Sequence, residues 1–484
     1  MEYIVIILYG LSLLLIFLFS LGQLHLTWHY LKAKKQKDVA VKPLQVYPKV
    51  TVQLPVYNER YVVQRLIDAV CRFEYPKEKL EIQVLDDSTD ETVEIIADKV
   101  NSWKAEGVNI KHIRREERTG FKAGALQYGL DMAEGEFIAV FDADFLPQPD
   151  FLIKTLPVFE NTTGVVQTRW GHLNKDYSIL TRLQAFGLDA HFSIEQTGRN
   201  HAGSFINFNG TGGVWRKKCI YDAGGWSADT LTEDLDLSYR AQMKGWKFKY
   251  LEDYTAPAEL PVIMTAVKSQ QYRWNKGAAE TARKNLGKVF RSPINGVGKL
   301  HAFFHLLNSS VFICLLLASV LSIPMLFIKD TYPAFNFIFN LGSIFLIGFL
   351  SIGFFYWIAS RQSHPKGTGK YYLTTFPVFL TVSMGLSLHN GIAVLEGLLG
   401  IKSPFIRTPK FNIKSKTDSW KDNIYVKRKI DFLTILEGFL SLYFMFGIAA
   451  GIYLNDLGLI IFHVMLTLGF ASVFYYSIKP LKHG

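Results

Sequence analysis

Three apolar stretches decide the fold: VTVQLPV (50–56), LEIQVLDD (80–87) and EFIAVFDAD (136–144). Each has the length and the β-branched, apolar composition of a buried strand. Between them the sequence predicts helices ending near Phe73 and Trp103, a short strand near 109–114, and a helix near 122–133. This alternation of strands and helices predicts a mainly parallel, doubly wound α/β sheet.

Acidic clusters stand at the ends of two of these strands, which is where open α/β sheets bind ligands. Asp86 and Asp87 end the second stretch, and Asp142 and Asp144 end the last. Two carboxylates one residue apart at a strand-to-loop corner can hold Mg²⁺ or Mn²⁺, because these ions prefer oxygen ligands and leave positions for phosphate oxygens. Such an ion would neutralise a leaving diphosphate. Ordinary exposed turns, with a cap for the next helix, are the alternative.

Two predicted helix starts carry further candidates. Lys122 lies in RTGFKAGAL (118–126), where a lysine could reach a phosphate beside a helix N-terminus. Asp234 follows Thr232 and Glu233 at the start of another helix, and a carboxylate held there could act as a general base. A solvated lysine and a helix-capping group are the structural alternatives.

The stretch QQYRW (270–274) lies on a further predicted helix. Trp274 could stack on a sugar face, and the planar guanidinium of Arg273 could hold a phosphate. Arginine and tryptophan are also common anchors at a membrane surface, which is the alternative interpretation.

The chain has 484 residues, of which 49% are apolar, and the apolar residues gather at its two ends. Residues 3–22 carry no charge, a length that spans a bilayer, and lysines follow this run. We therefore predict a retained anchor with its basic end in the cytosol, rather than a cleaved signal peptide. The expected organisation is an anchor (1–31), a cytosolic catalytic domain (32–300) and a membrane domain (301–484).

The membrane domain contains hydrophobic runs near 304–328, 336–360, 371–399, 432–454 and 457–478. The loops 361–370 and 400–430 are basic, and the positive-inside rule places both in the cytosol. The run 371–399 also holds polar residues that are costly at the bilayer centre. We therefore expect this run to be re-entrant or interfacial, which gives five spans and a cytosolic C-terminus. A sixth span is the alternative.

Composition excludes other classes of function. The net charge of +11 lies mainly beside apolar runs, as membrane topology predicts, so nucleic acid is not an expected partner. The cysteines Cys71, Cys219 and Cys314 form no paired spacing, which argues against disulfides and thiolate metal sites and suits a reducing compartment.

Taken together, the order D…DxD…TED…QxxRW resembles the processive branch of the family 2 inverting glycosyltransferases, the group of cellulose, hyaluronan and mannan synthases. The resemblance is closest to the plant cellulose-synthase-like A and C proteins, the glucomannan and glucan synthases. It covers roughly 50–285 and is carried by IQVLDDSTD, GFKAGAL, VFDADFLPQPDFL, FNGTGGVWR, DAGGW, TEDLDLSYRAQMKGWKF and QQYRWNKG. It implies an A-type glycosyltransferase fold inserted between transmembrane helices, with interfacial amphipathic helices.

The resemblance also implies a role for each matching position. Asp234 would be the general base, and Asp144, together with Asp142, would bind the metal. The donor nucleotide would contact Asp86, Asp87, Lys122, Asp142 and Arg273. The acceptor would contact Gln270, Trp274, Glu233, Phe208, Asn209, Gly210 and Thr211.

A further match is FIRTPK (405–410), which looks like the loop that closes over the nucleotide in cellulose synthases. Phe405, Thr408 and Lys410 would be its key residues. The sequence departs from the family pattern at Arg407, where valine is usual, and at Pro409. A plain basic surface loop is the alternative.

The resemblance implies transfer of a hexose from UDP-glucose or GDP-mannose to a growing glycan, with a β-1,4 linkage expected and export through the membrane coupled to synthesis. A glycolipid glycosyltransferase that adds one sugar to a lipid acceptor, similar to ceramide glucosyltransferases, is the alternative enzyme. A non-catalytic membrane scaffold is the alternative outside enzymes. The compact, Lys- and Ile-rich chain favours a bacterial inner membrane; a plant-like protein would lie in the Golgi membrane.

Overall fold

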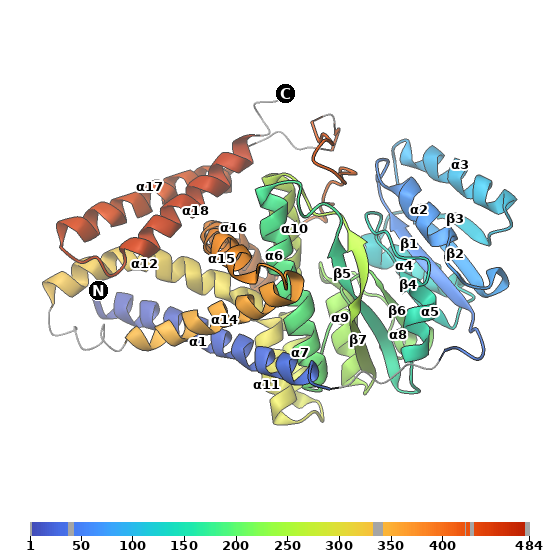
Figure 1. The fold of residues 1–484 in the computed structure, drawn as a ribbon, viewed down its shortest axis with the longest axis horizontal. Helices are drawn as coiled ribbons and strands as arrows, with labels where there is room; N and C mark the ends of the chain where they lie inside the picture. The colour runs from blue at the N-terminus through green and yellow to red at the C-terminus, as the bar shows by residue number, and fades with distance from the viewer. Residues whose placement is uncertain (1, 37–42, 333–341, 422, 426–429, 480–484) are drawn as a thin grey trace.

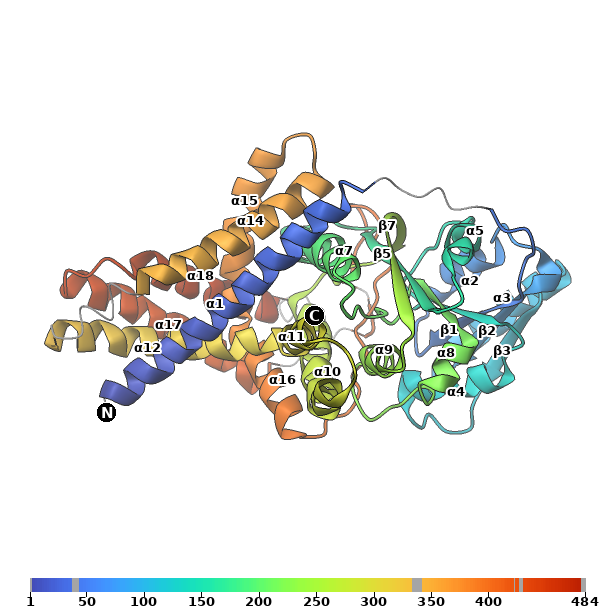
Figure 2. The same cartoon turned by 90° about the horizontal axis from the view of Figure 1, so that it is seen from below.

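The computed structural model describes residues 2–36, 43–332, 342–421, 423–425 and 430–479. A mixed α/β domain forms one half of the molecule and a group of long helices forms the other (Figure 1). The same division is visible from below (Figure 2).

The α/β domain is built on a sheet of order β3-β2-β1-β4-β6-β5-β7. Neighbours run parallel except that β6 is antiparallel to both β4 and β5. The strands are β1 (Val50–Val56), β2 (Leu80–Asp86), β3 (Ile110–Arg114), β4 (Phe137–Val140), β5 (Thr163–His172), β6 (Gly213–Arg216) and β7 (Lys247–Ala258). The mainly parallel sheet predicted from the sequence is therefore present.

The final predicted strand is shorter than expected. We expected it to run to residue 144, but β4 ends at Val140, where its pairing with β6 ends opposite Gly213. Beyond that point the Asp142 N–H donates to the Thr211 hydroxyl at 2.9 Å instead of to a strand. The two acidic residues therefore lie in the loop after the strand rather than on it.

Helices pack on both faces of the sheet, each over its own apolar core. Alternate residues of one strand serve the two cores: Phe137 and Ala139 face one, Ile138 and Val140 the other. The helices of this domain are α2 (Val63–Cys71), α3 (Thr92–Ala105), α4 (Phe121–Met132), α5 (Phe151–Thr155), α6 (Ile179–Ala190), α7 (Gln196–His201), α8 (Lys217–Asp222) and α9 (Glu233–Met243).

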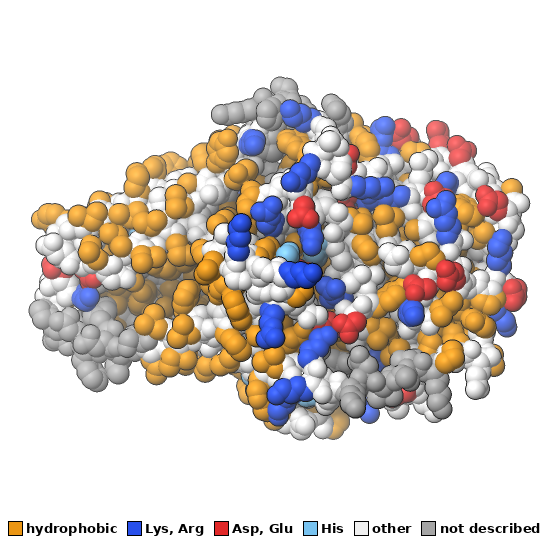
Figure 3. All heavy atoms as spheres, in the orientation of Figure 1, with side chains coloured by type: hydrophobic (Ala, Val, Ile, Leu, Met, Phe, Trp, Pro, Cys, Tyr) orange, Lys and Arg blue, Asp and Glu red, His pale blue; other side chains and the backbone are white. Residues whose placement is uncertain are grey.

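Helices α6 and α7 reach the helical half, and two further helices lie where the halves of the molecule meet. They are α10 (Met264–Arg291) and α11 (Gly296–Leu306). Figures 1 and 2 both place α10 between α9 of the α/β domain and α16 of the helical half. Lys and Arg side chains gather in a band near this junction, and hydrophobic side chains cover the helical half (Figure 3).

The helical half contains helices that are long and apolar enough to cross a membrane. Four satisfy that test singly among the described residues: α1 (Glu2–Ala33), residues 308–331 including α12 (Val311–Thr331), α17 (Phe432–Tyr453) and α18 (Ile460–Ile478). α14 (Leu346–Ser363) covers most of the run predicted at 336–360, but the start of that run lies outside the described residues.

The run 371–399 forms two helices instead of one. α15 (Thr368–Gly385) and α16 (Ser387–Leu399) meet at a bend of 52°, and as a pair they are apolar enough to form a fifth span. Such a bend occurs both in a broken span and in a re-entrant segment. The re-entrant arrangement therefore stays a prediction.

Candidate active site

A cleft opens at the carboxyl ends of the central strands, between the sheet and α10. It brings together residues from stretches that are far apart in the sequence. The predicted site residues that line it are Asp87, Lys122, Asp142, Asp144, Asn209, Gly210, Glu233, Asp234, Gln270, Arg273, Trp274, Phe405, Thr408 and Lys410.

The loop after β4 forms the floor of this cleft and carries two carboxylates that are each paired with a lysine. Lys122 lies 2.6 Å from Asp142 and donates to the Gly210 carbonyl at 2.9 Å. Burial would lower the pKa of Lys122, but Asp142 and Glu233 outweigh it and raise this pKa. The ammonium therefore stays charged beside the acidic loop.

The second floor carboxylate, Asp144, is buried and lies 2.7 Å from the Lys410 ammonium. In the folded chain the positive charge next to this carboxylate is thus that of a lysine side chain. Among the described residues no group of three or more His, Cys, Asp or Glu side chains has metal-binding geometry. The two aspartates nevertheless fit Mg²⁺ or Mn²⁺ bound with a diphosphate, because these ions commonly take one or two protein carboxylates and complete their shell with phosphate oxygens.

The start of α9 forms a wall of the cleft and supplies Asp234. Burial, reinforced by the neighbouring Glu233 carboxylate and opposed by Lys122, raises the pKa of Asp234 to about 7. Gly210 faces this side chain with φ +77°, and a Cβ there would lie 2.8 Å from Asp234 Oδ2. Only glycine gives the backbone room to pass this close. A carboxylate with a pKa near neutrality suits proton transfer.

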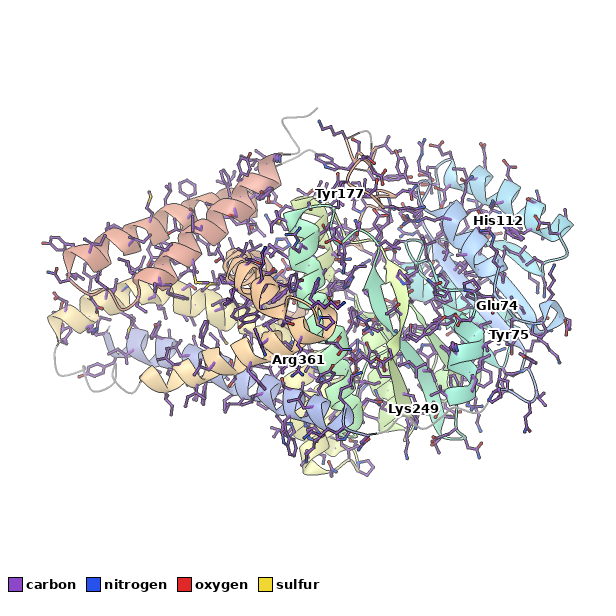
Figure 4. The ribbon with its side chains drawn as sticks, in the orientation of Figure 1. Glu74, Tyr75, His112, Tyr177, Lys249 and Arg361 are labelled. Atoms are coloured by element: carbon purple, nitrogen blue, oxygen red, sulfur yellow. The ribbon has the colours of Figure 1, made fainter. Side chains whose placement is uncertain are left out.

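Three predicted site residues do not line the cleft. The Asp86 carboxylate is buried, lies 2.8 Å from His112 Nε2 and accepts from the Ser88 N–H at 2.8 Å. Burial raises the pKa of Asp86, but these hydrogen bonds outweigh it and lower the pKa. Figure 4 labels His112 at the β3 side of the sheet. Asp86 therefore braces the end of β2.

The other two, Phe208 and Thr211, are fully buried behind the cleft. Phe208 packs edge-on against Trp215 at 5.4 Å between ring centres. Thr211 accepts the Asp142 N–H and thereby orients the acidic loop. Both lie beneath residues that line the cleft, so in this structure they support the site from below.

The segment 405–413 lies over the cleft. The Phe405 ring stacks on Phe121 with 5.5 Å between centres, and the Arg273 guanidinium lies 5.1 Å from the Phe405 ring centre. Arg407, which departs from the family pattern, lies 2.6 Å from Glu59. The segment is therefore bound to the site through the residues that the sequence singled out.

Sequence reasoning missed two buried carboxylates that hold this segment. Burial raises the pKa of Glu59 to about 7 even though Arg407 and Lys410 act to lower it. Glu259, just after β7, accepts the N–H groups of Phe411 at 2.8 Å and Asn412 at 3.0 Å. The sequence carries no signal for these contacts, because the partners lie more than a hundred residues apart.

Comparison with known proteins now bears on this cleft. Residues 48–277, which carry every predicted site residue except those of the 405–410 segment, match the family model described as "Glycosyltransferase like family 2". This part of the chain belongs to glycosyltransferase family 2.

Curated relatives of this chain include plant proteins. Glucomannan 4-beta-mannosyltransferase 1 of Oryza sativa subsp. japonica is 40% identical over 294 residues, covering 57% of this chain and 56% of the relative. Glucomannan 4-beta-mannosyltransferase 2 of Arabidopsis thaliana is 43% identical over 252 residues, covering 51% and 47%. The chain thus spans about half the length of these relatives.

Among solved structures, a mannosyltransferase from Pyrobaculum calidifontis, in complex with GDP-Man and Mn²⁺, has a TM-score of 0.55 and 19% identity. The match covers 82% of this chain and all of that one. At this identity the likeness establishes the fold alone. It confirms the A-type glycosyltransferase fold expected from the sequence.

Proposed function

We propose that the chain is a membrane-integrated, inverting glycosyltransferase that transfers a hexose from a sugar nucleotide to a growing β-glycan. One observation carries the proposal: a single cleft gathers the acidic loop of Asp142 and Asp144, the half-buried Asp234 and the front of the QxxRW helix. We assign the acidic loop to the leaving group, Asp234 to the general base and the QxxRW helix to the acceptor wall.

The proposed donor is GDP-mannose and the proposed linkage is β-1,4. The curated relatives named above are glucomannan 4-beta-mannosyltransferases, and they support mannose as the sugar. The structural neighbour was solved with GDP-Man. UDP-glucose, the other donor expected from the sequence, is the competitor to test.

On the donor side, Asp142 and Asp144 would hold Mg²⁺ or Mn²⁺, which when bound supplies positive charge to a departing diphosphate. Lys122 contributes a charged donor beside the same carboxylates. Lys410 would release Asp144 as the donor binds and turn to the phosphates. Lys122 is thus in place before the charge departs, whereas Lys410 moves to meet it as the donor binds.

On the acceptor side, Asp234 takes the proton from the attacking hydroxyl. The oxygen then bonds to the sugar's anomeric carbon as the bond to the diphosphate breaks, so one displacement inverts the configuration. Trp274 lies 6.3 Å from Trp170 between ring centres, and both line the cleft. We assign to these rings the stacking of the acceptor sugar.

The deciding experiment incubates the purified full chain with radiolabelled GDP-mannose, UDP-glucose and other sugar nucleotides, then sizes the products. Long β-1,4-mannan chains from GDP-mannose are expected. Products one sugar longer than a lipid acceptor would replace the polymerase with the glycolipid alternative. If a folded preparation binds none of the nucleotides and incorporates sugar from none of them, the scaffold interpretation is the one that remains.

The proposed topology places the catalytic domain and residues 400–430 in the cytosol. Ser415 is exposed in the 400–430 loop, and Leu457 is exposed in the opposite loop, before α18. An impermeant thiol reagent applied to intact cells should miss Ser415→Cys and label Leu457→Cys. Because Lys410 and Phe411 are bonded to Asp144 and Glu259 of the catalytic domain, efficient labelling of Ser415→Cys from outside would place that domain outside as well.

A further inference from the structure

The helix α10 has a front face in the cleft and a back face against the helical half. Gln270, Arg273 and Trp274 line the cleft and recur at helical spacing. Lys268 lies two positions before Gln270, roughly 200° around the helix, so it points the other way. The placement of α10 between α9 and α16 in Figures 1 and 2 agrees with this division.

The back face is fastened to α17 by a buried ion pair. Lys268 Nζ lies 2.7 Å from Glu437 Oε2 and donates to the Thr434 hydroxyl at 3.1 Å. The Lys268 and Glu437 side chains are 4% and 0% exposed. A carboxylate inside a helix apolar enough to cross a membrane is costly, and such a residue usually marks a functional contact with a partner.

The same face is fastened to α16, the second half of the bent pair. His389 Nε2 donates to the Lys268 carbonyl at 3.0 Å, and Lys276 Nζ lies 2.8 Å from Glu396 Oε2. A Cβ at Gly397 would lie 2.6 Å from the Lys276 carbonyl oxygen, so the two backbones are almost in contact. Movement of α16 would therefore displace α10.

The front of α10 is equally close to the catalytic wall. A Cβ at Gly277 would lie 2.5 Å from Thr232 Cγ2, two residues before Asp234. The segment over the cleft, 405–413, lies in the connection between α16 and α17. Both helices that flank this segment are thus bonded to the back of the helix whose front lines the cleft.

We propose that Lys268 and Glu437 are positioning residues for acceptor binding: their ion pair sets the placement of α10 and hence of Gln270 and Trp274. Neither side chain lines the cleft. The pair acts through the backbone of α10, and it transmits the position of the membrane helix α17 to the acceptor wall. This inference rests on the proposed function for its kinetic readout.

The test compares Lys268→Met, Glu437→Gln and the double variant Lys268→Met/Glu437→Leu, as full chains in lipid nanodiscs. With GDP-mannose and a short β-1,4-manno-oligosaccharide, each single variant should raise the acceptor KM about tenfold and change the donor KM less than about twofold. The double variant should recover most of this loss, because removing both charges leaves no buried charge unpaired. A purely destabilising change would instead lower the active fraction without altering either KM.

Asp456→Asn is the matched control. It breaks another ion pair of the helical half, Lys329–Asp456 at 2.7 Å, whose members lie on none of α10, α16 and α17. Its acceptor KM should match that of the wild type. An acceptor KM unchanged in both single variants, or raised as much in the control, would overturn the proposal.

Hydrogen exchange of α10 supplies a readout that needs no turnover. Amides of residues 264–277 should exchange faster in each single variant, with recovery in the double variant and no change in β1. If the wild type transfers from no donor, the proposed function fails while this measurement still decides the coupling. Unchanged exchange across 264–277 in both single variants would refute the coupling itself.

Discussion

The floor and the wall of the cleft use the same side chain in two different environments. On the floor, Asp142 and Asp144 lie 2.6 and 2.7 Å from the ammonium groups of Lys122 and Lys410. On the wall, Asp234 accepts the N–H of its own neighbour, Leu235, and burial raises its pKa to about 7. The floor carboxylates each face a cation, whereas the wall carboxylate has a pKa at which it can take up a proton near neutral pH.

This difference follows from what surrounds each group. Asp142 and Asp144 each face a lysine ammonium, whereas burial beside another carboxylate favours the neutral form of Asp234. Carboxylates whose environments differ in this way can divide acid–base and electrostatic work within one site. Lys122 connects the two, because it pairs with Asp142 and also acts to lower the pKa of Asp234.

The largest expected effect tests the floor. Chelation of divalent metal with EDTA should abolish transfer, because no metal ion would then neutralise the charge of the departing diphosphate. Added Mg²⁺ or Mn²⁺ should restore the rate, as measured by the product assay. Full activity in the presence of EDTA would show that Asp142 and Asp144 bind no metal ion needed for transfer. The contrast between the floor and the wall of the cleft would then no longer hold.

The next effect tests the wall. Asp234→Asn keeps the shape of the side chain but cannot accept the proton, so turnover should fall roughly 10²- to 10⁴-fold. Calorimetric titration with GDP and Mn²⁺ should give nearly wild-type affinity, because the nucleotide contacts are assigned to the floor. Asp222→Asn, on the exposed end of α8, is the control. Near-normal turnover would assign the general base to Glu233 instead. Lost GDP affinity would assign Asp234 to the donor site.

A smaller effect is expected from the residue that joins floor and wall. Lys122→Met removes one charged contact to the diphosphate, which should raise the donor KM about tenfold. The exposed Lys218→Met on α8 should leave this constant unchanged. A donor KM that did not respond would place the diphosphate away from Lys122.

The smallest effect concerns pH. Because the pKa of Asp234 is about 7, the carboxylate is protonated below that pH, and kcat/KM should be half-maximal near pH 7 and level off above it. In Lys122→Met this limb should shift to higher pH, since loss of a cation disfavours the charged carboxylate. A limb that stays in place in this variant would argue that another group controls it.

Much of the α/β domain could be predicted from the sequence because its signals are local. The stretch 50–56 forms β1 with the expected bounds, and α9 begins at Glu233, inside the stretch that was expected to precede this helix, although the Thr232 side chain makes no cap. The acidic clusters could be assigned to one edge of the sheet because carboxyl ends of parallel strands meet there. The QxxRW stretch, which lies on a helix, was placed beside them only through the family resemblance.

The rest depends on contacts that no local pattern encodes. Lys410 and Asp144 are 266 positions apart, and Lys268 and Glu437 are 169 apart. The contact of the buried Asp86 with His112 could not be predicted from the sequence either. The residues around Asp86 fit a ligand-binding motif and a purely structural contact equally well. The position of the bend, at Leu386, could not be predicted either, although the polar residues of 371–399 already set this run apart from the other hydrophobic runs.

The contact at Gly277 has a consequence for how this sequence can vary. A single methyl group at this position would collide with Thr232, so α10 can lie this close to the catalytic wall only because residue 277 has no side chain. Such a position tolerates no conservative replacement, as even alanine must move a neighbour of Asp234. A saturation library should therefore show Gly277 to be as restricted as the charged residues of the cleft, although it carries no functional group.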